Sequence, residues 1–294
     1  MRTERANAKI NLYLNVTGRR ENGYHDVVSL MQTVSLCDLV TLDFSTDTHT
    51  SIELHASGND AMPTDCRNLA WRAAEKYLAR VGLTGRVRIM IEKHIPMAAG
   101  LAGGSADAAA VLRGLNRICG ERLSTEELCA LGATLGADIP FCIVGGGARV
   151  SGIGECLEEV LPMPHTSLAV ACMGEGVSTP WAYGQLDARY GGFAEKKPED
   201  TRPDTILAAL SGGEISTACH GFYNIFEEVV PAVQPYVDRL KQVMEQSGAI
   251  RAMMSGSGPS VFGVFDRVED ASAAVEALRA MGAAAFVCHP TAKY

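Results

Sequence analysis

Hydrophobic and polar residues alternate in several stretches of the chain, which is typical of β-strands. Residues 8–16, AKINLYLNV, place four aliphatic side chains on one face and four more polar ones on the other: Ile10, Leu12, Leu14 and Val16 against Lys9, Asn11, Tyr13 and Asn15. We therefore predict a half-buried strand there. Similar alternation predicts strands over 51–55 and 86–96, each followed by turn residues or proline.

A helical period appears between and after these strands. Apolar residues on one stripe predict a helix over 68–80: Leu69, Ala73, Tyr77 and Leu78. A second helix is expected from about residue 105 to about 120. A capping box at 124–127 predicts the start of another, for which Gly136 is a plausible C-cap. Asp138 is placed to cap a short helix that has Pro140 in its first turn.

The alternation of strands and helices starts again after about residue 158. We expect strands over 168–172, 261–265 and 285–289, and helices after the pair Thr179-Pro180 and over 205–210, 236–247 and 271–281. The polar stretch 191–204 is most simply a surface loop. Two separate starts with mixed elements predict an α+β fold of two domains, 1–157 and 158–294.

Composition narrows the class of protein. The 294 residues are 47% hydrophobic, enough for a sizeable core, and no apolar run is long enough for a membrane span. A net charge of -8 argues against a nonspecific binder of nucleic acid or anionic membrane. Nine scattered cysteines without CxxC spacing indicate a reducing compartment rather than disulfides or a zinc site. We expect a cytoplasmic protein whose positive charge is local.

The run 96-PMAAGLAGGSADAAA-110 is the strongest candidate for a ligand site. Its small residues stand at a helix entrance, where free N–H groups and the helix dipole favour a phosphate. On its own the run fits a corner-turning loop equally well. It lacks both the Lys-Ser/Thr ending of a P-loop and the GxGxxG spacing of a dinucleotide site.

Several segments in order resemble the GHMP kinases, the family named for galactokinase, homoserine kinase, mevalonate kinase and phosphomevalonate kinase. The resemblance rests on the strand at 8–12 (AKINL), the run at 96–110 and the late loop 254-MSGSGPSVFGVF-265, and it extends through Gly23-Tyr24-His25, 136–142, 178–187 and 224–227. It implies the two-domain GHMP kinase fold: a ribosomal protein S5 domain 2-like N-terminal domain that binds ATP, a ferredoxin-like C-terminal domain, and an active site in the cleft between them.

The resemblance also implies roles for particular residues. Asp138 is expected to be the catalytic carboxylate near the acceptor hydroxyl, with Lys9 close by. The ATP phosphates, with Mg²⁺ bridging their oxygens, are expected along the loop and helix start: Pro96, Met97, Ala98, Ala99, Gly100, Leu101, Ala102, Gly103, Gly104, Ser105 and Ala106. The family more often has a second serine where this chain has Ala106, so one hydroxyl is lost there. No residue is assigned as a protein ligand of the metal, and Asp107 is better explained as a first-turn helix carboxylate.

The acceptor is expected to be a small alcohol that carries a cytidyl diphosphate. Asn11, Tyr24 and His25 are the implied substrate-binding residues, with Tyr24 and His25 recognising the base. Four basic residues are candidates, beside Lys9, for the positive charge that such an anionic acceptor requires: Arg19, Arg20, Lys93 and His94. A kinase of another alcohol, such as homoserine or mevalonate, and a catalytically silent binding protein are the alternatives. The sequence does not predict the oligomeric state.

Overall fold

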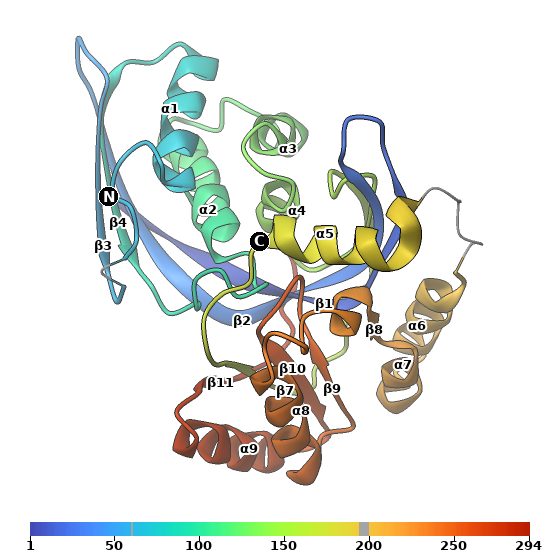
Figure 1. The fold of residues 1–294 in the computed structure, drawn as a ribbon. Coiled ribbons are helices and arrows are strands. Elements are labelled where there is room, and N and C mark those ends of the chain that lie inside the picture. The colour runs from blue at the N-terminus through green and yellow to red at the C-terminus, as the bar shows by residue number, and fades with distance from the viewer. Residues whose placement is uncertain (60, 194–199) are drawn as a thin grey trace.

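The computed structural model describes residues 1–59, 61–193 and 200–294, which form two β-sheets with helices packed on them (Figure 1). Within these residues, the first sheet has seven strands, in the order β3-β4-β2-β1-β8 with β5 paired to β2 and β6. Their bounds are β1 Arg2–Arg19, β2 His25–Thr46, β3 Ser51–Ser57, β4 Gly85–Glu92, β5 Gly147–Ser151, β6 Cys156–Val160 and β8 Tyr223–Asn224.

Four helices cover one face of this sheet (Figure 1). They are α1 Leu69–Val81, α2 Gly103–Ile118, α3 Thr125–Ala133 and α4 Ile139–Val144. The predicted capping box forms between Ser124 and Glu127. The helix predicted over 68–80 is α1, and the Asn68 side chain caps it by accepting from Ala70 N. The predicted C-cap at Gly136 is wrong, because α3 ends at Ala133 and is capped by Thr134.

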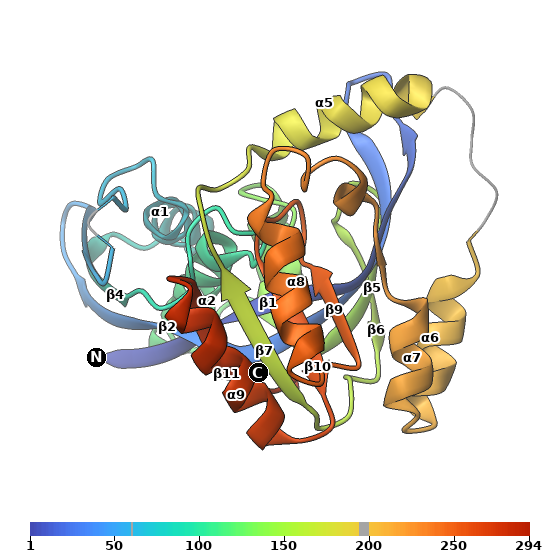
Figure 2. The ribbon, with the colours of Figure 1, turned by 60° about the horizontal axis from the view of Figure 1, so that its bottom comes forward.

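The second sheet confirms the ferredoxin-like prediction. Its elements follow one another as βαββαβ: β7 Ser167–Cys172, α8 Tyr236–Gln246, β9 Arg251–Met254, β10 Val261–Phe265, α9 Val268–Ala280 and β11 Ala284–Cys288. The strand order is β11-β7-β10-β9, and all neighbours are antiparallel. Figure 2 shows α8 and α9 side by side over one face of this sheet. The other face packs on β1 through a shared cluster that contains Ile10, Val170 and Phe262.

A helical excursion separates β7 from α8. It comprises α5 Thr179–Tyr190, the short 3₁₀ segment Gly191–Phe193, α6 Arg202–Ser211, α7 Ile215–Gly221, β8 and a second 3₁₀ segment, Ile225–Glu228. Of the loop predicted over 191–204, residues 194–199 lie outside the described residues, and α6 already begins at Arg202. Among the described helices, none has the length and apolarity needed to cross a bilayer.

The prediction of a half-buried strand over 8–16 is wrong. Every residue from Ala6 to Val16 is buried, because helices cover one face of β1 and the second sheet covers the other. The 22-residue strand β2, which pairs with β1, β4 and β5, escaped prediction because buried polar residues such as Gln32 and Asp38 interrupt its apolar pattern. The division at 157/158 remains a prediction; across it, β8 pairs with β1, and Lys293 bridges to Gly145.

Candidate active site

A pocket of about 1250 Å³ brings together segments that are far apart in the sequence. Its lining includes the loop after β4, the start of α2, part of β1, the turn before β2, the residue that precedes α4, and the first turns of α5. Gly256 and Ser257 of the late glycine loop complete it. Most residues that sequence reasoning selected therefore face one cavity.

The loop 96–102 has a strained backbone that the late glycine loop holds in place. Ala98, Gly100 and Ala102 have positive φ angles of 50°, 78° and 57°. Ser260 N donates to Ala99 O at 3.2 Å, and Ser255 Oγ donates to Gly100 O at 3.1 Å. A Cβ on Gly100 would lie 2.1 Å from Ser255 O, so only glycine fits there. Such strain persists where surrounding contacts fix the conformation, often at a ligand site.

Helix α2 begins at Gly103, two residues earlier than predicted. Its N-cap, Ala102, supplies no side-chain hydrogen bond, so the first N–H groups of the helix remain available to a ligand. Because Gly103, Gly104 and Ser105 line the pocket, these donors and the positive end of the helix dipole favour an anion there. Of the residues predicted along this loop, Leu101 and Ala106 are buried in apolar clusters and do not line the pocket.

Lys9 and Asn11 lie side by side on β1 and are both buried. Lys9 Nζ donates to Asn11 Oδ1 at 2.7 Å, and Asn11 Nδ2 donates to Ser29 Oγ at 2.8 Å. The Ser29 hydroxyl donates in turn to Tyr13 O. This chain of hydrogen bonds orients the lysine ammonium toward a pocket that it also lines, and it leaves further N–H donors of the ammonium for a ligand.

Asp138 occupies the N-cap position of α4, but its side chain does not cap the helix. Its carboxylate lines the pocket, and no hydrogen bond or ion pair joins it to another described residue, Lys9 included. The helix instead gains the usual backbone contact, in which Cys142 N donates to Asp138 O at 3.0 Å. The prediction of a capping role for the Asp138 side chain is therefore wrong, and the carboxylate is available to a ligand.

The predicted positive charge of Lys93 is neutralised by two buried carboxylates. Lys93 Nζ contacts Asp38 Oδ2 and lies 2.8 Å from Asp107 Oδ2, and all three side chains are buried. Burial opposes the charge on Lys93, but Asp107 and Asp38 outweigh it and raise the Lys93 pKa. Asp38 also accepts from the backbone N–H groups of His94 and Ile95, whereas Asp107 Oδ1 has no partner among the described residues.

The surroundings of the Asp107 carboxyl oppose its negative charge. Burial, reinforced by the charge of Asp38, raises its pKa to about 7 against the pull of Lys93. Its expected role as a first-turn carboxylate is wrong, since it lies in the second turn and pairs with Lys93. Arg20 and His94, two other expected cations, pair with Asp26 and Glu92 and do not line the pocket.

Tyr24 and His25 follow a turn in which Tyr24 N donates to Asn22 Oδ1. Tyr24 is 60% exposed at the pocket, whereas His25 is buried, with its Nε2 2.7 Å from Asp187 Oδ1. The His25 ring stacks on Tyr183 with centroids 4.6 Å apart. Tyr183 and Asp187 lie one turn apart on α5, and both line the pocket. Sequence reasoning did not select Tyr183, although it lies four residues before Asp187, a spacing that places both side chains on one face of a helix.

Two family models match the chain, and both describe GHMP kinases. The model of the GHMP kinases N terminal domain matches residues 68–146, and that of the GHMP kinases C terminal matches 206–284. Together they cover more than half of the chain. The fold, the glycine-rich loop at a helix start and these matches place the protein in the GHMP kinases.

Individual relatives narrow the family further. A 4-diphosphocytidyl-2-C-methyl-D-erythritol kinase of Alkaliphilus metalliredigens is 41% identical over 93% of this chain and 91% of its own length. One of Bacillus pumilus is 41% identical over 89% of this chain and 87% of its own. The crystal structure of a 4-(cytidine 5'-diphospho)-2C-methyl-D-erythritol kinase is 35% identical, covers 98% of this chain and 99% of its own, and superposes with a TM-score of 0.79.

A mevalonate kinase of L. major has a TM-score of 0.74 at 14% identity, over 99% of this chain and 97% of its own, which shows a common fold. The relatives at 35–41% identity over most of each chain show more than a common fold. They show that the chain belongs to the 4-diphosphocytidyl-2-C-methyl-D-erythritol kinase family within the GHMP kinases.

Proposed function

We propose that this protein transfers the γ-phosphoryl group of ATP to the 2-hydroxyl of 4-diphosphocytidyl-2-C-methyl-D-erythritol, a step of the non-mevalonate route to isoprenoids. The observation that carries the proposal is one pocket that joins an uncapped helix start, a lysine, a free carboxylate and an exposed tyrosine ring. The names of the relatives at about 40% identity support the same reaction.

The ATP phosphates would lie against the loop 96–102 and the start of α2. Backbone N–H groups there provide directional donors, and the helix dipole contributes further stabilisation of negative charge. We further propose that residues 1–157 form the ATP-binding domain and 158–294 the domain that contributes the late glycine loop. ATP as phosphoryl donor fits a cytoplasmic enzyme.

The pocket residues fit a magnesium ion held largely by the phosphates. The described residues contain no cluster of three or more histidine, cysteine or acidic side chains that could hold an ion, and Mg²⁺ at kinase sites usually has few protein ligands. Ser105, which lines the pocket beside the helix start, would supply the hydroxyl ligand that Ala106 cannot. The ion would neutralise charge on the phosphate oxygens.

The transfer itself would depend on Asp138 and Lys9. The acceptor oxygen forms a bond to the γ-phosphorus as the bond from that phosphorus to the β,γ-bridging oxygen breaks, and ADP leaves. Asp138 would orient the acceptor hydroxyl and receive its proton late, because a loose transition state needs little early deprotonation. The Lys9 ammonium, oriented by Asn11, would stabilise the negative charge that develops on the oxygens.

The cytidyl group would lie at the turn 22–25. The ring of His25 is already covered by Tyr183, so the exposed ring of Tyr24 is the face open to stacking with a base. Asp187 fixes the His25 ring by accepting from its Nε2. Arg19 lies 3.4 Å from the same aspartate at the edge of the pocket and could attract the diphosphate of the substrate.

The test is ADP release by the purified protein with ATP and Mg²⁺ and four separate acceptors. These are the cytidyl substrate, the same methylerythritol phosphate lacking its cytidylyl group, homoserine and mevalonate. We expect turnover with the cytidyl compound alone. Turnover with another alcohol would keep the fold but reject base recognition, and no turnover with any acceptor would favour a silent binding protein.

A further inference from the structure

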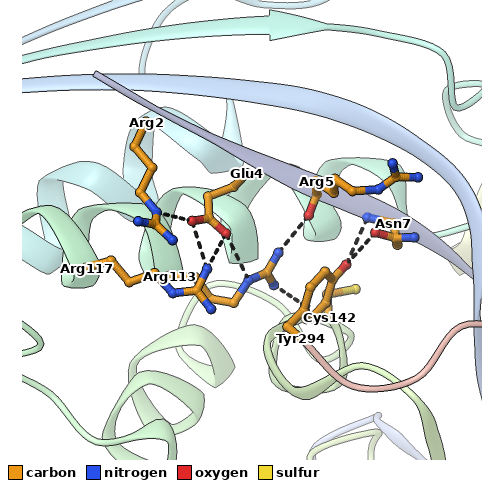
Figure 3. A network of polar contacts seen from close by, with 8 residues as sticks. All are labelled: Arg2, Glu4, Arg5, Asn7, Arg113, Arg117, Cys142 and Tyr294. Carbon is orange, nitrogen blue, oxygen red and sulfur yellow. Dashed lines mark hydrogen bonds and ion pairs between the residues drawn. The ribbon is translucent and has the colours of Figure 1, made fainter.

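Arg113 lies at the meeting point of the three elements that carry the proposed catalytic groups (Figure 3). It is on α2, whose first residues face the proposed phosphate site, and its side chain is 5% exposed. Its guanidinium contacts α4, which begins after Asp138, and β1, which carries Lys9. None of these contacts lies in the pocket itself.

The contact with α4 reaches Asp138 through the helix backbone. Arg113 Nη1 donates to Cys142 O at 2.5 Å, and Cys142 N donates to Asp138 O at 3.0 Å. The Cys142 carbonyl belongs to the last turn of this short helix, where carbonyls lack intrahelical partners and a cation is favourable. The guanidinium therefore fixes the helix whose N-cap residue presents the proposed catalytic carboxylate.

The contact with β1 lies four residues before Lys9, at Arg5. Arg113 Nη2 donates to Arg5 O at 2.8 Å. The pairing of β1 with β2 shifts register between Asn7 and Lys9, so the strand needs other contacts to hold its path there. Asn7 receives them from Tyr294, whose hydroxyl accepts from Asn7 N at 2.9 Å, and the Tyr294 ring lies 3.5 Å from Arg113 Cζ.

Glu4 supplies the negative charge opposite the buried guanidinium of Arg113. Arg113 Nε lies 3.8 Å from Glu4 Oε2, and Arg117 Nη1 lies 2.7 Å from the same oxygen. Burial opposes ionisation of Glu4, but hydrogen bonds from Arg2 and Arg117 outweigh it and lower the pKa of the carboxyl. A lysine at 113 would keep a charge, but it lacks the planar pair of terminal nitrogens that reach two carbonyls at once.

We propose that Arg113 is a positioning residue that sets Asp138 relative to Lys9 and the start of α2. The inference rests on the proposed function, since it assumes that Asp138 and Lys9 act on the acceptor hydroxyl. A misplacement of about 1 Å can cost on the order of 100-fold in rate. Loss of the Arg113 contacts should thus slow transfer without removing any group that binds substrate.

The first test compares Arg113→Lys with Arg117→Lys at a temperature where both are folded. For Arg113→Lys we expect kcat to fall about 10- to 100-fold, while KM for ATP and for the cytidyl substrate changes less than about threefold. Arg117 pairs with the same Glu4 and, among the described residues, forms no hydrogen bond or ion pair with α4, so kcat of the Arg117→Lys variant should stay within about twofold of wild type. Equal losses of kcat in the two variants would overturn the proposal.

A double-mutant cycle with Asp138→Asn separates positioning from general damage. If Arg113 acts through Asp138, adding Arg113→Lys to Asp138→Asn should lower kcat by less than about twofold. A further tenfold loss would overturn the proposal. Arg113→Gln, which keeps a donor without the charge, serves in the same cycle if the lysine variant does not fold.

The two proposals fail in different ways. If the wild-type protein does not turn over the cytidyl substrate, both the proposed function and the positioning role are overturned. If the wild type is active but the losses of kcat in the cycle are additive, only the positioning role of Arg113 is rejected.

Discussion

Two walls of the pocket are built from different parts of the chain. The phosphate wall consists of residues 96–100, 102–105, 256 and 257, and the contacts that hold it are mostly those of backbone atoms and small residues. The acceptor wall consists of side chains from β1, the turn before β2 and the two helices α4 and α5: Lys9, Asn11, Tyr24, His25, Asp138, Tyr183 and Asp187. Hydrogen bonds between side chains orient several of them.

The difference predicts how each wall responds to change. The backbone N–H groups of the phosphate wall remain donors whatever side chain their residue has. A close approach such as that of Gly100 to Ser255, however, leaves no room for a Cβ. Each side chain of the acceptor wall carries a separate chemical role, and Tyr24, which is exposed, and Asp138, whose side chain has no hydrogen bond from another described residue, can be replaced without leaving a buried partner unpaired. Substitutions in the phosphate wall should therefore weaken ATP binding and stability together, and substitutions in the acceptor wall should separate turnover from acceptor affinity.

The largest effect is expected for Asp138→Asn on the acceptor wall. Loss of the carboxylate should lower kcat about 1000-fold, within the range for a positioned acid–base group, and leave ATP affinity within about threefold. Steady-state kinetics and ATP titration would measure both. Asp204→Asn is the control, because Asp204 is an exposed aspartate outside the pocket. Unchanged turnover in Asp138→Asn would remove this residue from the mechanism.

Gly100→Ala tests the phosphate wall. Its Cβ would meet Ser255 O at 2.1 Å with φ at 78°, so we expect stability to fall by about 2 kcal/mol or more and ATP KM to rise about tenfold. Gly82→Ala is the matched control, since Gly82 also has a positive φ, of 67°, but nothing within 4 Å of the added Cβ. Equal destabilisation in the two variants would show that backbone angle alone, not the contact between loops, matters.

Tyr24→Ala tests base recognition. Stacking of a base on an aromatic ring is worth about 1–3 kcal/mol, so affinity for the cytidyl substrate should fall at least about fivefold while ATP affinity stays within about twofold. Tyr236→Ala, at an exposed tyrosine outside the pocket, should change neither affinity. If Tyr24→Ala weakened both ligands equally, the tyrosine would not be specific to the acceptor wall.

The smallest effect is expected at Asp107, in the second turn of α2 next to the phosphate wall. Its pKa in the folded protein, about 7, lies above the ordinary value of 3.8, so folding takes up a proton. This contribution to stability is complete below about pH 4 and is lost as pH rises through about 7. The melting temperature of wild type relative to Asp107→Asn should therefore fall by about 2–4 °C between pH 5 and pH 8. A relative rise over that interval would contradict the assignment.

Local sequence signals predicted the elements that depend on local chemistry. The capping box at Ser124 defines a helix start, and the small residues at 100–104 stand at the entrance of α2, as predicted. Burial of Lys9 and Asn11 was not predictable from alternation, because it depends on a second sheet that packs from residues more than 150 positions away. The neutralisation of Lys93 likewise depends on Asp38, 55 residues earlier. Such long-range pairs have no local sequence signature.

The most direct test of the two-wall account is a competition between ligands. ATP binding would be titrated in the absence and in the presence of saturating cytidine diphosphate, with the reverse titration as a check. If ATP uses the phosphate wall and the cytidyl group uses the acceptor wall beside Tyr24, cytidine diphosphate should leave the Kd for ATP within about threefold. A Kd for ATP that rises in proportion to the concentration of cytidine diphosphate would show that both nucleotides occupy one site, and would contradict the account.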